Sequence, residues 1–170
     1  RHIGCNLVRA LLKEGHEVRT LVREDTRGID GLEVERVSGD VLDPESLDRA
    51  FAGAEVVFHC AANISVDGSV GDEQLRVNAE GPANVADACL KAGVKKLNHF
   101  SSLHAISEFP RDEPITEENG LVKPEEDPLP YSRTKALGEE AIHAAVKRGL
   151  WAVVLNPSGV IGAHDYKVSH

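Results

Sequence analysis

The chain has 170 residues, of which 41% are hydrophobic and 28% charged, and its formal net charge is -9. These values are ordinary for one globular domain with a real core, and the length is short for two domains. The negative charge disfavours general binding to nucleic acid or to anionic membranes, because both are polyanions. No apolar run approaches the roughly 20 residues that cross a bilayer, and no charged-then-apolar leader opens the chain. We therefore expect a cytoplasmic protein.

The three cysteines, Cys5, Cys60 and Cys89, lie far apart and have no Cys-x-x-Cys spacing. This odd, scattered set within apolar segments predicts reduced, buried thiols rather than a disulfide framework or a zinc site. The eight histidines are similarly dispersed, and none is paired with a carboxylate at ligand spacing. We predict no metal site.

Hydrophobic periodicity predicts helices and strands that alternate along the chain. An amphipathic helix over 3–12 comes first, with no strand before it, and Gly15 ends it. The predicted strands are 16–22, 33–37, 54–60, 95–101 and 151–155. A second helix is predicted to begin at Pro44, with Asp43 as its N-cap. Two more helices are predicted over 72–91 and 131–148. This alternation indicates an α/β fold, a doubly wound parallel sheet, in which the apolar run 54–60 is a buried strand.

One long irregular stretch, 107–130, is rich in Pro, Glu and Asp. It exceeds ordinary loop lengths, and the strand–helix pattern resumes after it. These features favour a lid or a substrate-facing loop over a domain linker.

The most informative stretch is Tyr131-Ser132-Arg133-Thr134-Lys135. Residues four apart share a face of a helix, so the phenol of Tyr131 and the ammonium of Lys135 project the same way. A nearby cation lowers the pKa of a tyrosine from its usual value of about 10 toward the working range of acid–base catalysis. A hydroxyl from Ser101-Ser102, at the end of a predicted strand, could then hold a substrate oxygen beside the phenol. The alternative is a solvated tyrosine and lysine on a surface helix.

Together with "HCAA" (59–62), "VNAEGPANV" (77–85) and "LNPSGVIG" (155–162), these motifs resemble the extended short-chain dehydrogenases/reductases, the NAD(P)-dependent epimerase/dehydratase superfamily. Within it, "SSLHAI" and "NPSGVIGAHDY" look most like the dihydroflavonol reductase-like branch. The resemblance implies a Rossmann-like NAD(P)-binding domain over 1–170. It also implies an oxidoreductase that transfers a hydride between a nicotinamide cofactor and a carbonyl or alcohol of a small organic substrate.

Carried over by position, the resemblance makes Tyr131 the catalytic acid/base and Lys135 the residue that lowers its pKa and binds the nicotinamide ribose. Ser102 matches the catalytic serine, with Ser101 as the fallback; a strand-end cap is the alternative role for Ser102. Asn78 matches an asparagine that would organise water or backbone near Lys135, although a polar contact inside its helix is the competing interpretation.

Cofactor residues follow from the same resemblance. Of the family's glycine-rich turn only Gly4 is present. Arg23, supported by Arg27, would pair with a 2′-phosphate and favours NADP(H), with NAD as the alternative cofactor. The competing interpretation is that both arginines are solvated loop charges without a role in binding. Asp40 and Val41 match the adenine contact, unless Asp40 serves a turn. The remaining expected cofactor contacts are Ala61, Ala62, Ser101, Pro157 and Ser158, whereas His59 is expected to be structural.

The family's first strand and its C-terminal substrate-binding portion have no counterpart in these residues. The first strand would lie centrally, between 16–22 and 54–60, so we expect its absence to leave apolar faces and ladder groups open. We therefore expect part of a longer chain that is inactive by itself. Two other functions stay open: a nucleotide-sugar epimerase or dehydratase that recycles its hydride, and a non-catalytic dinucleotide-binding protein. A small-molecule substrate is expected, and a homodimer is left open.

Overall fold

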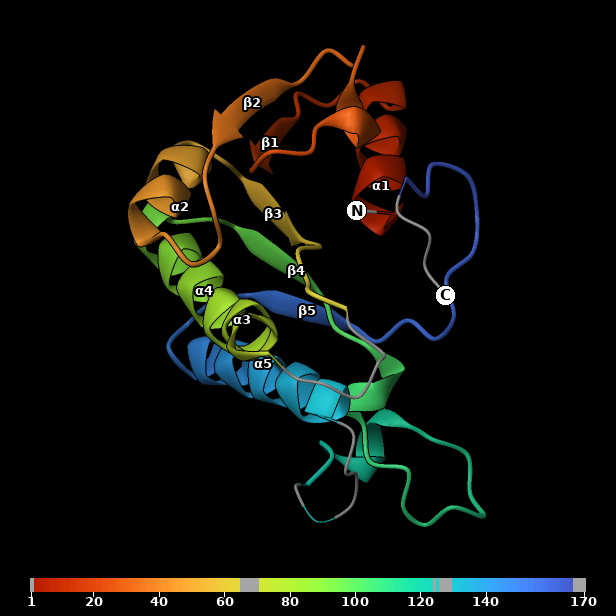
Figure 1. Cartoon of the computed structure of the whole chain (residues 1–170). Helices are drawn as coiled ribbons and strands as arrows, with labels where there is room; N and C mark the ends of the chain where they lie inside the picture. Colours follow the sequence, from red (N-terminus) through yellow and green to blue (C-terminus); the bar gives the residue numbers. More distant parts are fainter. Residues whose placement is uncertain (1, 65–70, 124, 126–129, 167–170) are drawn as a thin grey trace.

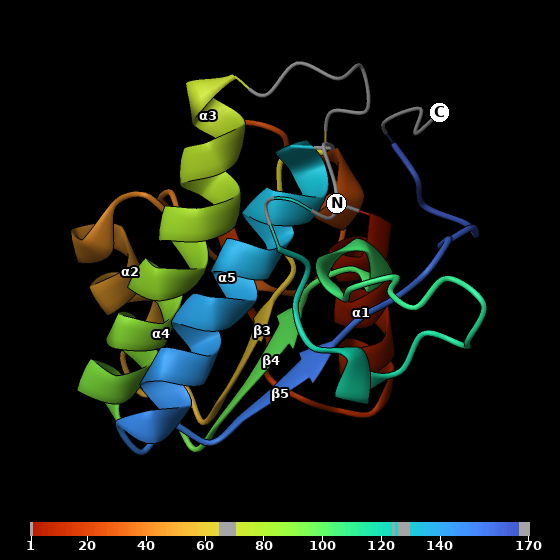
Figure 2. The ribbon, with the colours of Figure 1, turned by 90° about the horizontal axis from the view of Figure 1, so that it is seen from below.

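The structure is a computed structural model, and it describes residues 2–64, 71–123, 125 and 130–166. Parallel strands form its middle layer, α1 (His2–Lys13) lies on one side, and the helices that pack on the core lie on the other (Figures 1 and 2). These are α2 (Pro44–Phe51), α4 (Gly81–Ala92) and α5 (Pro130–Lys147). None of the described helices is long and apolar enough to span a membrane.

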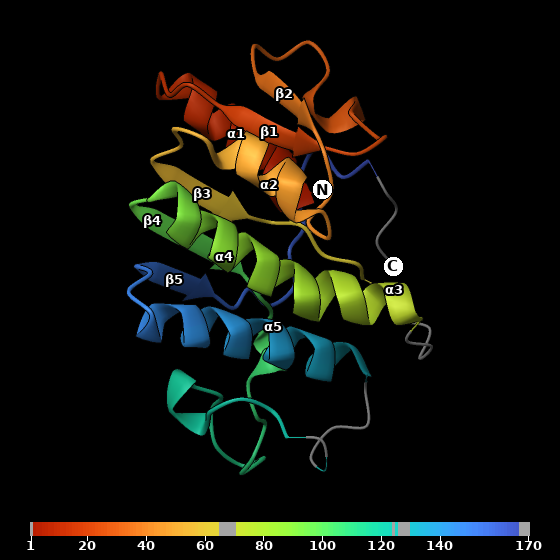
Figure 3. The ribbon, with the colours of Figure 1, turned by 90° about the vertical axis from the view of Figure 1, so that its left-hand side faces the viewer.

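The strands are parallel, as predicted, but they form two sheets. β1 (Arg19–Val22) pairs with β2 (Glu35–Ser38). β4 (Lys96–Phe100) pairs on one edge with β3 (Val56–His59) and on the other with β5 (Ala152–Leu155). No ladder joins β1 to β3 in the described chain, although the two strands are neighbours in Figure 3. The α/β class with a parallel, incomplete sheet is confirmed, and the break falls where the sequence predicts a missing central strand.

Each predicted strand is present but shorter than predicted, and β2 ends at Ser38, one residue beyond the predicted range 33–37. The expectation that 54–60 is buried on both faces is wrong. Val57 and His59 are buried, whereas Val56 and Phe58 are 45% and 37% exposed. Other side chains cover only the face of β3 that meets the core. Burial therefore alternates from residue to residue along the strand.

Helix capping follows the predicted chemistry. The carboxylate of Asp43 accepts a hydrogen bond from the backbone N–H of Glu45, and Pro44 occupies the first turn of α2. The C-terminal end of α4 is capped by Gly93, which adopts φ +68°. Left-handed backbone of this kind suits glycine because it has no Cβ.

The helix predicted over 72–91 is not uniform. α3 (Asp72–Leu75) passes into a π-helical segment, Arg76–Glu80, before α4 begins. Such wide turns are rare and often occur at functional sites. The segment carries Asn78, so the irregularity coincides with a candidate site residue.

The stretch 107–130 contains more local structure than its composition predicts. Glu117–Asn119 forms a 3-10 turn capped by Thr116, and Ile106 pairs with Leu121 through an isolated bridge. Residues 124 and 126–129 lie outside the described part of the chain, and no role as a lid is tested.

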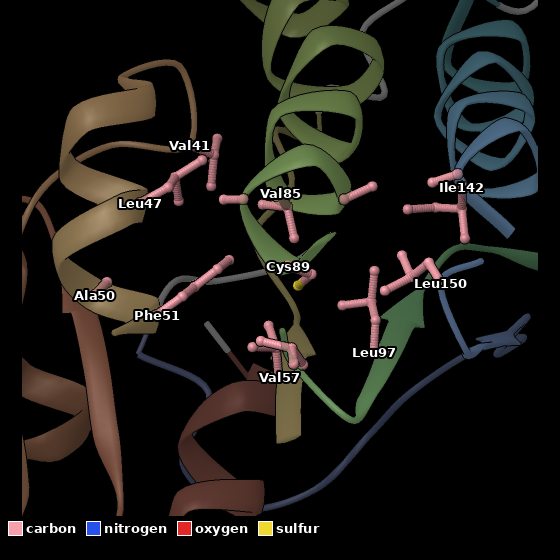
Figure 4. Packing of buried hydrophobic residues seen from close by; sticks show 14 of the residues in the cluster. Val41, Leu47, Ala50, Phe51, Val57, Val85, Cys89, Leu97, Ile142 and Leu150 are labelled. Atoms are coloured by element: carbon pink, nitrogen blue, oxygen red, sulfur yellow. The ribbon is translucent and has the colours of Figure 1, made fainter. Parts of the chain in front are cut away.

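The hydrophobic core lies between the three-stranded sheet and the helices α2, α4 and α5 (Figure 4). Its fully buried members include Leu47, Cys89, Leu97 and Ile142. Because each comes from a different element, burying them fixes how these helices lie on the sheet.

Candidate functional site

The candidate residues follow the carboxyl ends of parallel strands, which point toward the same edge (Figure 3). Segments 60–62, 101–102 and 156–158 follow β3, β4 and β5, and α5 supplies the tyrosine and lysine. Open α/β sheets bind ligands at this edge. The fold therefore gathers residues that are widely separated in sequence.

Ser102 and Tyr131 meet at this edge. The hydroxyl of Ser102 lies close enough to the phenol of Tyr131 to act on its pKa, and the ring of His104 lies edge-on to the tyrosine at 6.2 Å between centroids. Ser102 also accepts a hydrogen bond from the backbone N–H of His104, so the strand-end cap considered for it is present as well. The two roles are compatible because a hydroxyl both donates and accepts.

Lys135 lies one turn further along α5 and is only 3% exposed. Its Nζ donates to the backbone carbonyl of Phe100 at 3.1 Å. Burial lowers the pKa of Lys135 to about 8, while the charge of Glu139 opposes that shift. An amine with a pKa near the working pH is uncommon and marks candidate functional sites.

The expected lowering of the Tyr131 pKa is not found. Burial raises the pKa of the phenol, and the hydrogen bond from Ser102 only partly opposes this shift. Desolvation penalises the phenolate, and the Lys135 ammonium is bonded to the Phe100 carbonyl. Tyr131 is therefore held in its protonated form near neutral pH.

Asn78 is buried in the π-helical segment and binds the loop after β3. Its Oδ1 accepts from the backbone N–H of Asn63 at 2.9 Å, and its Nδ2 donates to the Asn63 carbonyl at 2.8 Å. The same Nδ2 donates to Thr134 Oγ1 on α5 at 3.2 Å. Asn78 therefore organises backbone between β3 and the helix that carries Lys135, and its contacts extend beyond its own helix.

The expected adenosine end of the site carries an ion pair. Arg23 Nε lies 3.1 Å from Asp40 Oδ2, and an Arg23 guanidinium nitrogen lies 3.7 Å from Glu73. Asp40 also accepts from the backbone N–H of Leu42, which is the turn role considered for it. The Val41 side chain is buried in the core. Arg27 gives Arg23 little support, because two of its nitrogens are bonded to Asp25.

The other predicted cofactor residues lie along the same edge or behind it. Ala61, Ala62 and Ser158 are exposed, and the Pro157 carbonyl accepts from the backbone N–H of Leu103. Ser101 is buried, and its Oγ has no hydrogen-bond partner among the described residues. Gly4 lies within α1, where an added Cβ would meet Cys60 at 3.6 Å. Small exposed side chains, a cation and an unbonded hydroxyl fit a dinucleotide along this edge.

A family model described as the NAD dependent epimerase/dehydratase family matches residues 2–170. The chain belongs to this family. Sterol demethylase protein B of Methylococcus capsulatus is 36% identical to it over 170 residues, covering 99% of this chain and 51% of that protein. A dihydroflavonol 4-reductase-like protein of Synechocystis sp. is 32% identical over 167 residues, covering 97% of this chain and 48% of that protein. The resemblance noted in the sequence, including the dihydroflavonol reductase-like relatives, is thus confirmed.

The fold of this chain is also similar to that of solved structures. The UDP-glucose 4-epimerase of Thermus thermophilus, in complex with NAD, superposes with a TM-score of 0.77 at 32% identity. The match covers 91% of this chain and 51% of that one. The chain thus spans about half the length of the relatives described here.

Several residues of the site were missed by sequence reasoning. Glu139 and Asn156 form a partly buried hydrogen bond behind Ser102, and the backbone of Asn63 both donates to and accepts from the side-chain amide of Asn78. Asn156 directly follows β5, a position where a polar residue is informative. Glu139 lies four residues after Lys135, which was a usable signal for a charge pair.

Buried histidines and cysteines complete the surroundings. His59 and His99 stack at 5.1 Å between centroids, and burial lowers their pKa values to about 3 and about 2. They are neutral core residues, in line with the structural role predicted for His59. Cys5 and Cys89 are buried and Cys60 is half-buried, all three as free thiols. The described residues include no group of His, Cys, Asp and Glu that could hold a metal ion.

Proposed function

We propose that the protein is an NAD(P)-dependent oxidoreductase of the extended short-chain type, which transfers a hydride between a nicotinamide and a carbonyl or alcohol carbon. One observation carries the proposal: the side chains of Ser102 and Tyr131 meet at the ligand-binding edge, one helical turn from the buried amine of Lys135. A donor pair beside a cation is suited to protonate an oxygen that develops negative charge. The reductase-like relatives support this reaction class.

The mechanism assigns one task to each side chain. When bound, the reduced nicotinamide supplies a hydride to the carbonyl carbon. Ser102 donates a hydrogen bond to the carbonyl oxygen, and Tyr131 gives that oxygen its phenolic proton. The raised pKa of Tyr131 keeps this proton available near neutral pH. The Lys135 ammonium then stabilises the phenolate that remains.

The cofactor would lie along the strand ends. Lys135 and Ser101, with Pro157 and Ser158, would hold its nicotinamide half. Ala61 and Ala62 leave room for the dinucleotide, and Arg23, Asp40 and Val41 would face the adenosine half. We propose NADP(H) as the preferred cofactor, because Arg23 places a guanidinium at the end of β1 where a 2′-phosphate would lie.

The test is Tyr131→Phe in the full-length protein. Losing the proton donor should lower kcat by about 10²- to 10⁴-fold, while the cofactor Kd stays within about twofold, since the ring and its packing remain. Steady-state kinetics with a panel of carbonyl substrates and cofactor fluorescence titration measure the two quantities.

Tyr166→Phe is the matched control, because Tyr166 is the second of the two tyrosines of the chain and hydrogen-bonds His164 outside the site. We expect this control to keep wild-type kcat. A fully active Tyr131→Phe protein would overturn the assignment.

The likeness to UDP-glucose 4-epimerase favours a second candidate, a nucleotide-sugar epimerase or dehydratase with the same residues and a recycled hydride. The two candidates differ in cofactor balance. A reductase oxidises one cofactor for each product molecule, whereas an epimerase turns over without net consumption. Binding of the dinucleotide with no turnover by either route would point to a non-catalytic binding protein.

A further inference from the structure

A buried polar chain lies directly behind the proposed catalytic groups. Asn156 Nδ2 donates to the backbone carbonyl of Ser102 at 3.0 Å and also to a carboxylate oxygen of Glu139. Both partners are acceptors, so the orientation of the Asn156 amide is determined by its contacts. The chain connects the end of β4, the end of β5 and the middle of α5.

Glu139 is an unusual residue for this position. Its side chain is 4% exposed, whereas Glu140, the next residue, is exposed. Carboxylates are almost never fully buried unless they are paired. Glu139 accepts a hydrogen bond from the amide of Asn156, and its charge opposes the lowering of the pKa of Lys135, which lies one turn earlier on the same helix.

The other titratable groups that act on Lys135 add no charge near neutral pH. Burial lowers the pKa values of His59 on β3 and His99 on β4 to about 3 and about 2, so neither imidazole becomes a cation there. Burial raises the pKa of Cys60, beside β3, to about 11, so its thiol is protonated. Among the described groups that act on Lys135, Glu139 is therefore the carboxyl group that opposes the lowering of its pKa.

We propose that Glu139 and Asn156 are a positioning pair, in which Asn156 fixes the backbone of Ser102 and Glu139, buried one helical turn beyond Lys135, is the counter-charge to its amine. Neither residue needs to touch substrate or cofactor. The inference rests on the proposed function for its catalytic consequence. The effect of Glu139 on the charge of Lys135 does not depend on that function, and a titration of Lys135 measures it without turnover.

Glu139→Gln isolates the charge, because the glutamine Oε1 can still accept from Asn156. Without the carboxylate, Lys135 loses its proton at lower pH, since burial alone then sets its acidity. We expect the alkaline limb of the kcat–pH profile to move down by at least about half a pH unit. An NMR titration of the labelled Lys135 side chain should show its midpoint moving the same way.

Glu140→Gln, at the exposed neighbour, is the matched control and should leave both readouts unchanged. Glu139→Asp retains the charge and should keep the limb near its wild-type position. If Glu139→Gln folds with an unshifted lysine midpoint, the counter-charge role is wrong.

Asn156→Ala isolates the backbone contact. It frees the Ser102 carbonyl while Glu139 keeps its charge, and we expect kcat to fall about tenfold at the optimum with the cofactor Kd nearly unchanged. An unchanged kcat in a folded Asn156→Ala protein would exclude the positioning role of Asn156. If instead Tyr131→Phe is fully active, the proposed function fails, and the lysine titration still decides the role of Glu139.

Discussion

At the scale of single residues, the site is held by side chains that bind backbone far away in sequence. Lys135 donates a hydrogen bond to the Phe100 carbonyl. The side chain of Asn78 accepts from the backbone N–H of Asn63 and donates to its carbonyl. Each contact satisfies a polar group that would be costly to bury alone, at about 1–3 kcal/mol. The same contacts fix where the strand ends lie relative to α5.

Arg23 is the residue whose surroundings decide the cofactor proposal. Its side chain is 60% exposed and already paired with Asp40, so a 2′-phosphate would compete with that carboxylate. We expect wild-type kcat/KM to favour NADPH over NADH. Arg23→Ala should reduce the ratio by about tenfold through loss of a charge-assisted contact, with the NADH value nearly constant.

Arg148→Ala is the control for Arg23→Ala. Arg148 is also 60% exposed and ion-paired, with Asp87, and it lies at the opposite end of α5 from the site. Its replacement should leave the ratio unchanged. A clear wild-type preference for NADH would refute the proposal that Arg23 binds the 2′-phosphate of NADP(H).

At the scale of elements, α5 packs closely on the π-helical segment that carries Asn78. A Cβ built on Gly138 of α5 would lie 2.5 Å from the Asn78 backbone carbonyl and 3.1 Å from Pro82 Cγ. The first contact is with backbone, which cannot swing aside as a side chain can. A glycine in the middle of α5 therefore allows the two helices to approach, despite its poor helix propensity.

Gly138→Ala tests this packing. The added methyl group should destabilise the fold by about 1–3 kcal/mol, because the clash outweighs the gain in helix propensity of roughly 1 kcal/mol. Urea unfolding of the 170-residue chain measures the difference. Gly71→Ala is the control, since Gly71 has φ -70° and no atom within 4 Å of an added Cβ. A Gly138→Ala chain as stable as the Gly71 variant would contradict the close approach.

At the scale of the whole molecule, the two sheets differ in how they are supported. β4 is hydrogen-bonded on both edges and lies against the core, whereas β1 and β2 pair only with each other among the described strands. Two isolated strands are marginal in water, and three with a covered face are stable. Stability should therefore be concentrated in the half of the molecule that contains the candidate site.

Hydrogen exchange on the 170-residue chain tests this distribution. Amides of β4 should exchange at least about 100-fold more slowly than those of β1, because β1 opens in local fluctuations that leave the core intact. The buried helix α4 is an internal reference and should resemble β4. Equal protection in β1 and β4 would contradict the difference in support.

The alternation of predicted strands and helices was enough to give the parallel α/β class, because each pattern reports how one segment buries its own apolar face. The capping of α2 by Asp43 was predictable for the same reason, since all its determinants lie within four residues. The π-helical segment was not, because it packs against α5 around Gly138, about 60 residues later in the chain, and local pattern does not report such a contact.

The sequence by itself determined the family, the order of the elements and the identities of Ser102, Tyr131 and Lys135 as candidates, because these are properties of local pattern and spacing. Only the tertiary structure decided their surroundings. It showed that burial raises the pKa of Tyr131, that Arg23 is paired with Asp40, and that Glu139 and Asn156 stand behind the site. Desolvation and charge pairing depend on which segments meet in space, and that information exists only once the chain has folded.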